Sequence, residues 1–168
     1  IREVTRGSMN PNQYFSGHWA PFAAFKFTPG DRPLESIDVG DTAGELKIVS
    51  GPGETPFAFR WCPPGSFRMG SPEAEIDRLR NEEQVTVNLS WGFWMAETET
   101  THRQWEVVMG DNPGLFKAFG SEEGPVENVN WNEAVKCATR LSEEWKKRGL
   151  IDDGWEVRLP TEAEWEYA

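Results

Sequence analysis

Two cysteines are the residues of this chain with the widest range of chemistry, because a thiolate is a nucleophile, a redox centre and a soft metal ligand. Cys62 directly precedes Pro63, and Cys137 lies beside Ala138 on the apolar side of a predicted helix. We expect both to be small buried apolar residues and neither to be catalytic. The chain has no CxxC pair or Cys/His cluster, so a structural zinc site is not expected.

The other acid–base candidates are two histidines and three acidic pairs. His18 lies in a predicted loop, and His102 lies in the first turn of a predicted helix, where we expect it to be exposed. Because the two are far apart in sequence, a metal site that used both would need a third ligand from elsewhere. The acidic pairs are interpreted as solvated surface: Glu122-Glu123, Glu143-Glu144 and Asp152-Asp153. We therefore predict no catalytic, cofactor-binding or metal-binding residue in this chain.

Nine tryptophans are many for 168 residues. Flat aromatic rings stack on sugars, so a carbohydrate-binding surface is one interpretation. Core packing is the favoured one, because four rings fall at the buried phase of predicted strands and helices. These four are Trp61, Trp131, Trp145 and Trp165.

Composition restricts the partners. With 38% apolar and 27% charged side chains, 168 residues suffice for one ordinary domain. Lys and Arg total 17 against 28 Asp and Glu, and a net charge of -11 repels phosphate backbones, so nucleic acid is not expected as a partner. No apolar run approaches the roughly 18 to 20 residues of a spanning helix. We therefore expect no membrane insertion.

Apolar and polar residues alternate with a period of two in several segments, which predicts strands. These strands would position the cysteine and tryptophan side chains described above. They run over residues 57–62, 67–69, 85–89, 93–96 and 155–159. Pro63-Pro64-Gly65 predicts a type II turn, since Pro fixes φ and Gly accepts a positive φ. The charged stretch 71–83 predicts a solvated loop or a short helix.

Three capping boxes predict the starts of three helices, because a side-chain oxygen there accepts a backbone N–H while the residue three positions later reaches back. The pairs are Thr101 with Gln104, Asn130 with Glu133, and Thr161 with Glu164. The second helix has the clearest 3.6-residue apolar repeat. Gly110 and Gly149 predict the ends of the first two helices.

Five strings follow one another in a fixed order through this part of the chain. They are Trp61 to Ser71 (WCPPGSFRMGS), Glu97 to Thr101 (ETETT), Pro125-Val126, Val129 to Ala134 (VNWNEA) and Arg158 to Ala168 (RLPTEAEWEYA). Their order and spacing resemble the formylglycine-generating enzyme family, also called sulfatase-modifying factors. The resemblance implies an α+β, C-type-lectin-like fold, truncated here, with mixed short strands, two to three helices and many loops.

The resemblance also implies a chemistry and its location. Active members of the family are copper-dependent oxidases that convert a sulfatase cysteine into formylglycine, using two cysteines in the second half of the domain. Copper and calcium are thus implied by family resemblance at positions this chain does not cover, and no cofactor is expected in the chain itself. Cys137 matches a position where some members carry half of a structural disulfide, so a bridge to a cysteine beyond Ala168 is the alternative to a buried thiol.

The first 40 residues are similar to the end of such a domain. Arg2 to Met9 (REVTRGSM) is similar to a string near the domain end, and Phe22 to Gly40 is similar to the closing segment. In active members the catalytic cysteines sit just after the first of these strings. Residues 10–17 (NPNQYFSG) occupy that place here and contain no cysteine, so they offer no copper(I) ligand pair and no nucleophile.

These similarities predict a junction between two family domains in a tandem array. Residues 1–40 would be the C-terminal tail of a preceding domain, 41–56 a linker and lead-in strand, and 57–168 the N-terminal part of the next domain. A circularly permuted single domain is the alternative. The chain begins at Ile1 and stops within a predicted helix at Ala168, so we expect a piece of a longer protein. Residues 1–40 could also supply a closing strand to residues 57–168.

Two functions follow from the resemblance. The first is a non-catalytic binding or scaffold member that takes a protein or a glycan, favoured by the missing cysteines. The second is part of a formylglycine-generating oxidase whose catalytic cysteines lie beyond Ala168. A third class, oxidative sulfur transfer, would need a histidine-rich iron-binding domain that this sequence does not contain. The resemblance suggests a bacterial protein, exported or periplasmic, with a neighbouring domain of the same type.

Overall fold

The computed structural model describes residues 2–3, 24–27, 39–79, 82–115 and 122–168. His18 and the cysteine-free stretch 10–17 lie outside these ranges. The described elements are β1 Arg2–Glu3, β2 Ala24–Phe27, β3 Leu46–Ser50, the 3-10 turn η2 Pro52–Glu54, β4 Pro56–Cys62, β5 Gly65–Met69, β6 Val85–Leu89, β7 Phe93–Ala96, α1 His102–Met109, α2 Trp131–Lys147, β8 Trp155–Arg158 and α3 Glu162–Tyr167. No helix within the described ranges is long and apolar enough to cross a membrane.

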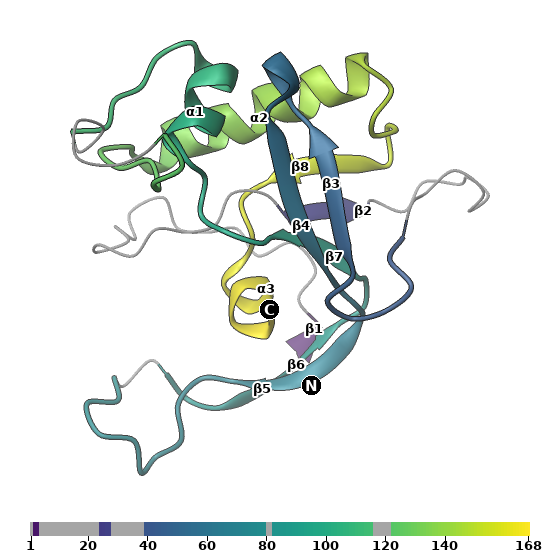
Figure 1. Ribbon diagram of the computed structural model, residues 1–168. Coiled ribbons are helices and arrows are strands. Elements are labelled where there is room, and N and C mark those ends of the chain that lie inside the picture. The colour runs from purple at the N-terminus through teal and green to yellow at the C-terminus, as the bar shows by residue number, and fades with distance from the viewer. Residues whose placement is uncertain (1, 4–23, 28–38, 80–81, 116–121) are drawn as a thin grey trace.

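The described strands form two sheets, so the structure is mixed α/β. The larger sheet has the order β3-β4-β7-β2-β8, and all its neighbouring strands are antiparallel. The smaller sheet has the order β1-β6-β5, in which β1 and β6 are parallel. Figure 1 shows α1 and α2 together at one end of the larger sheet, and α3 between that sheet and the projecting β5–β6 hairpin.

Strand β4 contributes side chains to two separate hydrophobic cores. Its residues Phe57, Phe59 and Trp61 are at most 7% exposed and face the first core, which α2 covers with Leu141 and Trp145. The Phe57 and Trp145 rings meet edge to face at 5.4 Å and 88°, a favourable geometry for aromatic pairs. The second core lies under α3 and consists of Cys62, Val87, Leu89, Phe93, Met95 and Ala163.

All three predicted capping boxes are present. Thr101 Oγ1 accepts from Gln104 N at 3.1 Å, and Gln104 Oε1 accepts from Thr101 N at 3.0 Å. The boxes of α2 and α3 have the same reciprocal bonds. Gly110 ends α1 at φ 85°, in the left-handed region that favours glycine. The predicted strands and helices are thus confirmed to within about two residues, the ordinary uncertainty of element ends.

The predicted type II turn at Pro63-Pro64-Gly65 is wrong. Gly65 does not have a positive φ; it is the first residue of β5, and β4 and β5 belong to different sheets. The glycine is needed for space instead, because a Cβ there would lie 2.2 Å from the Tyr167 hydroxyl oxygen. The charged stretch after β5 forms turns and extended loop over 71–79 and 82–83, with no helix in those described parts.

Residues from the first 40 enter the larger sheet. β2 is antiparallel to both β7 and β8 and lies between them. In the following segment β3 pairs with β4 over its full length, from Leu46 opposite Arg60 to Ser50 opposite Pro56. The division of the chain into 1–40, 41–56 and 57–168 as parts of two domains stays a prediction.

Candidate functional site

The two thiols lie in different cores. Cys62 ends β4 in the second core, Cys137 lies on α2 in the first core, and both are buried and free. Burial, and to a smaller extent the charge of Glu164, raises the pKa of Cys62 to about 11. Burial raises the pKa of Cys137 to about 12, against a smaller lowering by Arg140. Both residues are therefore protonated at neutral pH and do not form a thiol pair.

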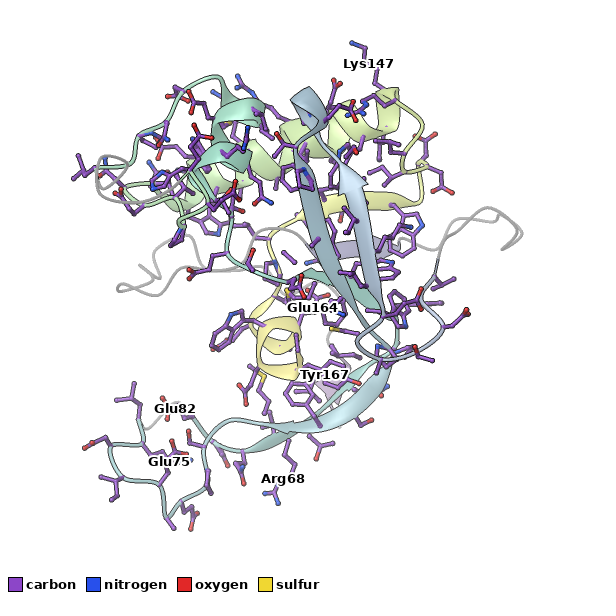
Figure 2. All side chains as sticks on the ribbon, viewed as in Figure 1. Arg68, Glu75, Glu82, Lys147, Glu164 and Tyr167 are labelled. Atoms are coloured by element: carbon purple, nitrogen blue, oxygen red, sulfur yellow. The ribbon has the colours of Figure 1, made fainter. Side chains whose placement is uncertain are left out.

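A partly buried ion pair between β8 and α3 lies next to Cys62. Arg158 Nη1 donates to Glu164 Oε2 at 2.8 Å, and Nη2 donates to Oε1 at 2.6 Å. Thr161 donates to the same Oε2 from its backbone N at 2.8 Å and from Oγ1 at 3.0 Å. Figure 2 shows Glu164 on α3 close to the strands of the larger sheet. We call Arg158, Thr161 and Glu164 the β8–α3 clasp.

The clasp holds its carboxylate in the charged form. Burial would raise the pKa of Glu164, but the hydrogen bonds and charge of Arg158, together with the Thr161 bonds, outweigh burial and lower it. Both oxygens already accept strong hydrogen bonds, and the side chain is 6% exposed. The arrangement therefore joins two elements and leaves this carboxylate unsuited to bind a metal or to act as a general base.

The rest of α3 fixes the β5–β6 hairpin. Glu166 Oε1 accepts from Gly70 N at 2.7 Å, and the Tyr167 ring lies 5.3 Å from Phe67 and 6.3 Å from Phe93. In Figure 2 the Tyr167 side chain lies between α3 and the hairpin. The string Arg158 to Ala168, which carries most of the family resemblance, is thus largely a set of structural contacts.

His102 is buried, which makes the expected exposure wrong. It is 4% exposed as the first residue of α1. Its Nδ1 lies 3.0 Å from Asn112 Oδ1, which also accepts from Gly114 N at 3.0 Å. Because that oxygen is the acceptor in both contacts, we assign the proton to His102 Nδ1.

Glu127 also lies beside Gly114. A Cβ on Gly114 would lie 2.1 Å from His102 Cε1 and 2.8 Å from Glu127 Oε1, so the imidazole and carboxylate close around this one glycine. Glu127 is 8% exposed. We call His102, Asn112, Gly114 and Glu127 the His102 cluster. The hydrogen bond between His102 and Asn112 connects loop 111–115 to the start of α1.

The tryptophan prediction is half correct. Trp61 and Trp145 are 4% and 0% exposed, but Trp131 is 40% exposed and Trp165 is 56% exposed. Trp131 is the first residue of α2, whose buried residues begin only at Cys137, and Trp165 directly follows the buried Ala163 and Glu164 of α3. Together with Trp91, at 48% exposure, they place large aromatic rings at the surface.

The surface charges do not form a metal-binding group in the described part of the chain. No three His, Cys, Asp or Glu side chains come together there in a way that could hold an ion. Glu122 and Glu123 flank Arg103 at 3.6 and 3.7 Å, and all three side chains are more than half exposed. Exposed pairs of this kind contribute little to stability.

Comparison with known proteins gives one family and two relatives. Residues 52–168 match the Sulfatase-modifying factor enzyme 1-like domain, FGE-sulfatase. Chaperone protein LppX of Paenibacillus barcinonensis is 39% identical over 113 residues, which cover 52% of this chain and 38% of that protein. The solved structure of Treponema denticola variable protein 1 superposes with a TM-score of 0.57 at 25% identity, covering 73% of this chain and 55% of the other.

The chain thus spans less than two thirds of either relative. The family match covers most of the chain and begins at η2, so it includes β4 to α3, the whole of the second core and every residue of the first core except Val49. It also includes the clasp, the His102 cluster and both cysteines. The chain belongs to the FGE-sulfatase family of sulfatase-modifying factor enzyme 1-like domains.

Proposed function

We propose that this chain acts as a non-catalytic member of the FGE-sulfatase family, a binding or scaffold domain for a protein or glycan ligand. Its fold would be a truncated, C-type-lectin-like α+β arrangement, part of a tandem array in a bacterial protein. The main support for the proposal is that both thiols are buried and protonated, and the exposed aromatic residues give further support.

The carrying observation is that both cysteines are buried, in separate cores, with pKa values of about 11 and about 12. At pH 7 a thiol of pKa 11 is ionised in roughly one molecule in ten thousand. A copper(I) centre or a redox nucleophile needs a thiolate. These two residues would therefore give the chain no oxidising centre.

Exposed aromatic rings support binding. Trp91, Trp131 and Trp165 are each at least 40% exposed, and Trp dominates binding energy in many interfaces because it offers large area at low entropic cost. The similar protein LppX is named a chaperone, which favours a polypeptide ligand over a glycan.

An assay with a sulfatase-derived peptide tests the proposal. The chain would be incubated with a cysteine-containing peptide, copper(I) and oxygen, and the peptide mass would be followed for formylglycine. We expect no conversion. Conversion that disappears after the chain is alkylated would contradict the proposal.

The second candidate is part of an active formylglycine-generating oxidase, which the family match over 52–168 favours. Its catalytic cysteines, with copper and calcium, would lie beyond Ala168. The discriminating observation is the reading frame of the parent gene. A cysteine pair after a second Arg-Gly-Gly-Ser-like string downstream would favour the oxidase, and its absence would favour the binding domain.

A further inference from the structure

The β5–β6 hairpin ends in a charged loop that projects from the rest of the described molecule (Figure 1). We call it the hairpin loop, defined as the described residues 70–79 and 82–84 between β5 and β6. Figure 2 shows Glu75 and Glu82 in this loop, at the end of the hairpin that is remote from α3. The sequence predicts solvated loop here, and the function proposed above gives it no role.

Hydrogen bonds hold the neck of the hairpin loop closed. Ser71 N donates to Glu82 O at 3.0 Å, and Gln84 Nε2 donates to Gly70 O at 3.1 Å. Gly70 has a φ of 93°, and a Cβ there would lie 2.9 Å from Glu82 O, so the two sides of the neck are in close contact. Glu166 of α3 accepts from Gly70 N at 2.7 Å. The loop is therefore presented to solvent on a fixed base.

Within the loop, polar side chains bind the loop's own backbone while apolar side chains are exposed. Arg78 Nε donates to Ser71 O at 2.9 Å, and Glu82 Oε2 accepts from Leu79 N at 3.2 Å. Ile76 and Leu79 are 87% and 59% exposed, and Ile76 is the most exposed large apolar side chain in the described part of the chain. Exposed apolar side chains with polar residues around them, on a projection, are typical of an interaction site.

The charge of the loop indicates which partner fits it. The carboxylates of the described loop are Glu73, Glu75, Asp77, Glu82 and Glu83. Arg78 is the one basic side chain in the same residues, and no basic side chain of the described ranges forms an ion pair with these carboxylates. Such a surface attracts cations and repels phosphate backbones and anionic lipid. A basic polypeptide with apolar residues matches both the charge and the exposed side chains.

We propose that the hairpin loop is a docking surface for a cationic segment of a protein ligand. Ile76 and Leu79 would contact apolar side chains of that segment, and the exposed carboxylates would pair with its Lys or Arg residues. The inference rests on the proposed binding function, and it adds a contact surface and the charge of the ligand. Because the neck is already fixed by hydrogen bonds, less of the binding free energy is lost in ordering the loop.

Titration of the full chain with a labelled peptide of alternating Lys and Leu, followed by anisotropy at low and high salt, tests the proposal. Two double variants remove the two features separately. Ile76→Ser/Leu79→Ser removes the exposed apolar side chains, and Glu73→Gln/Glu75→Gln removes two exposed carboxylates. Neither variant removes a hydrogen bond of the neck.

Each variant has a matched control outside the hairpin. Ile48→Ser/Leu115→Ser removes two apolar side chains that are 61% and 70% exposed. Glu122→Gln/Glu123→Gln removes two carboxylates whose side chains are 72% and 65% exposed. The controls therefore change apolar area and net charge as the hairpin variants do, at other places on the surface.

We expect wild type to bind the peptide and both controls to bind it like wild type. The Ile76→Ser/Leu79→Ser variant should bind roughly tenfold more weakly at both salt concentrations. The Glu73→Gln/Glu75→Gln variant should bind roughly fivefold more weakly at low salt, with a smaller difference at high salt because salt screens exposed charges.

Other outcomes overturn the proposal. If the Glu122/Glu123 control loses as much affinity as the Glu73/Glu75 variant, the peptide is attracted only by the net charge of -11. If the chain binds a reduced, carboxymethylated polypeptide but not the Lys-Leu peptide, the docking surface is wrong while the proposed binding function stands; binding to neither contradicts both. Binding of zwitterionic vesicles in place of the peptide, lost in Ile76→Ser/Leu79→Ser, would make the loop a membrane contact instead.

Discussion

At the scale of residues, several side chains pack directly against a glycine, in the space that a Cβ would occupy. Rings or carbonyls lie where a Cβ would be at Gly40, Gly51, Gly65, Gly92 and Gly114. The Trp61 ring lies beside both Gly40 and Gly92, at 2.3 Å from each hypothetical Cβ. Large aromatic rings therefore fit in this small domain because glycine makes room for them.

Gly114→Ala tests the His102 cluster. The new methyl group would overlap His102 and Glu127, which are both buried, so we expect a loss of about 1 to 3 kcal/mol in the free energy of unfolding. Gly44→Ala is the control, because it has open space and a φ of 77°, and so tests backbone strain alone. Urea unfolding in which the Gly114→Ala variant is as stable as wild type would contradict the packing explanation.

Glu164→Gln tests the β8–α3 clasp through pH. The folded-state pKa of Glu164 is lowered, so its contribution is present above the unfolded-state value near 4.5 and disappears as the pH falls through the folded-state value. We expect the variant to lose about 1.5 to 3 kcal/mol at pH 7, and the difference from wild type to shrink below pH 4.5. Glu156→Gln, which removes the exposed partner of Arg158, is the matched control.

A difference between wild type and Glu164→Gln that stays constant from pH 7 to pH 3 would contradict the clasp. The measurement is chemical unfolding at each pH, followed by Trp fluorescence. A small effect of the Glu156 control at every pH is expected, because its carboxylate is 50% exposed.

Residue-level prediction from sequence succeeded for the cysteines and failed for His102, Trp131 and Trp165. The cysteines could be placed because strand alternation and helix phase say which side of one element is buried. His102 is buried by loop 111–115 and the segment around Glu127, whereas Trp131 and Trp165 are 40% and 56% exposed on their helices. Such burial depends on contacts between distant segments, which local periodicity does not encode.

At the scale of elements, local chemistry decides where helices begin. The three capping boxes and the left-handed Gly110 were read from residue type alone and occur at those positions. The turn after β4 failed because Pro-Gly is equally compatible with a strand start, and a tertiary contact with Tyr167 decides between them.

Asn130→Ala tests the cap of α2. Asn130 Oδ1 accepts from Glu133 N at 3.1 Å and is lost in the variant, so we expect about 1 kcal/mol less stability. Thr139→Ala, at an exposed position inside the same helix, should be neutral or slightly stabilising. Thermal unfolding by circular dichroism compares them. An Asn130→Ala variant as stable as the Thr139 control would contradict the role of the cap.

At the scale of the whole molecule, the family was visible in the order of five strings, whereas the arrangement of the sheet was not. The strings mark the clasp and the capping boxes, which are local in sequence. They also contain both partners of the hairpin anchor between Gly70 and Glu166, which are 96 residues apart. The position of β2 between β7 and β8 joins segments more than 60 residues apart. Nothing in the alternation of Ala24 to Phe27 specifies these partners.

The double variant Trp131→Ala/Trp165→Ala tests whether the exposed tryptophan rings bind the proposed polypeptide ligand. Both rings are at least 40% exposed, so the double variant should fold normally. We expect it to bind a reduced, carboxymethylated polypeptide roughly tenfold or more weakly than wild type, in a titration followed by anisotropy of the labelled polypeptide. The control is Ile48→Ser, which removes another exposed apolar side chain, at 61% exposure. Trp145→Phe is not used because Trp145 is buried in the core. Equal affinity of wild type, the double variant and the control would contradict a binding role of these two rings.

The most direct test of the account is thiol labelling of the native chain. Iodoacetamide at pH 7.5, followed by intact mass measurement, should give no adduct on the folded protein and two adducts in urea, because both thiols are buried with pKa values of about 11 and about 12. Rapid addition of one adduct to the folded protein, at the rate of an unprotected cysteine, would contradict the claim that the chain has no reactive thiol.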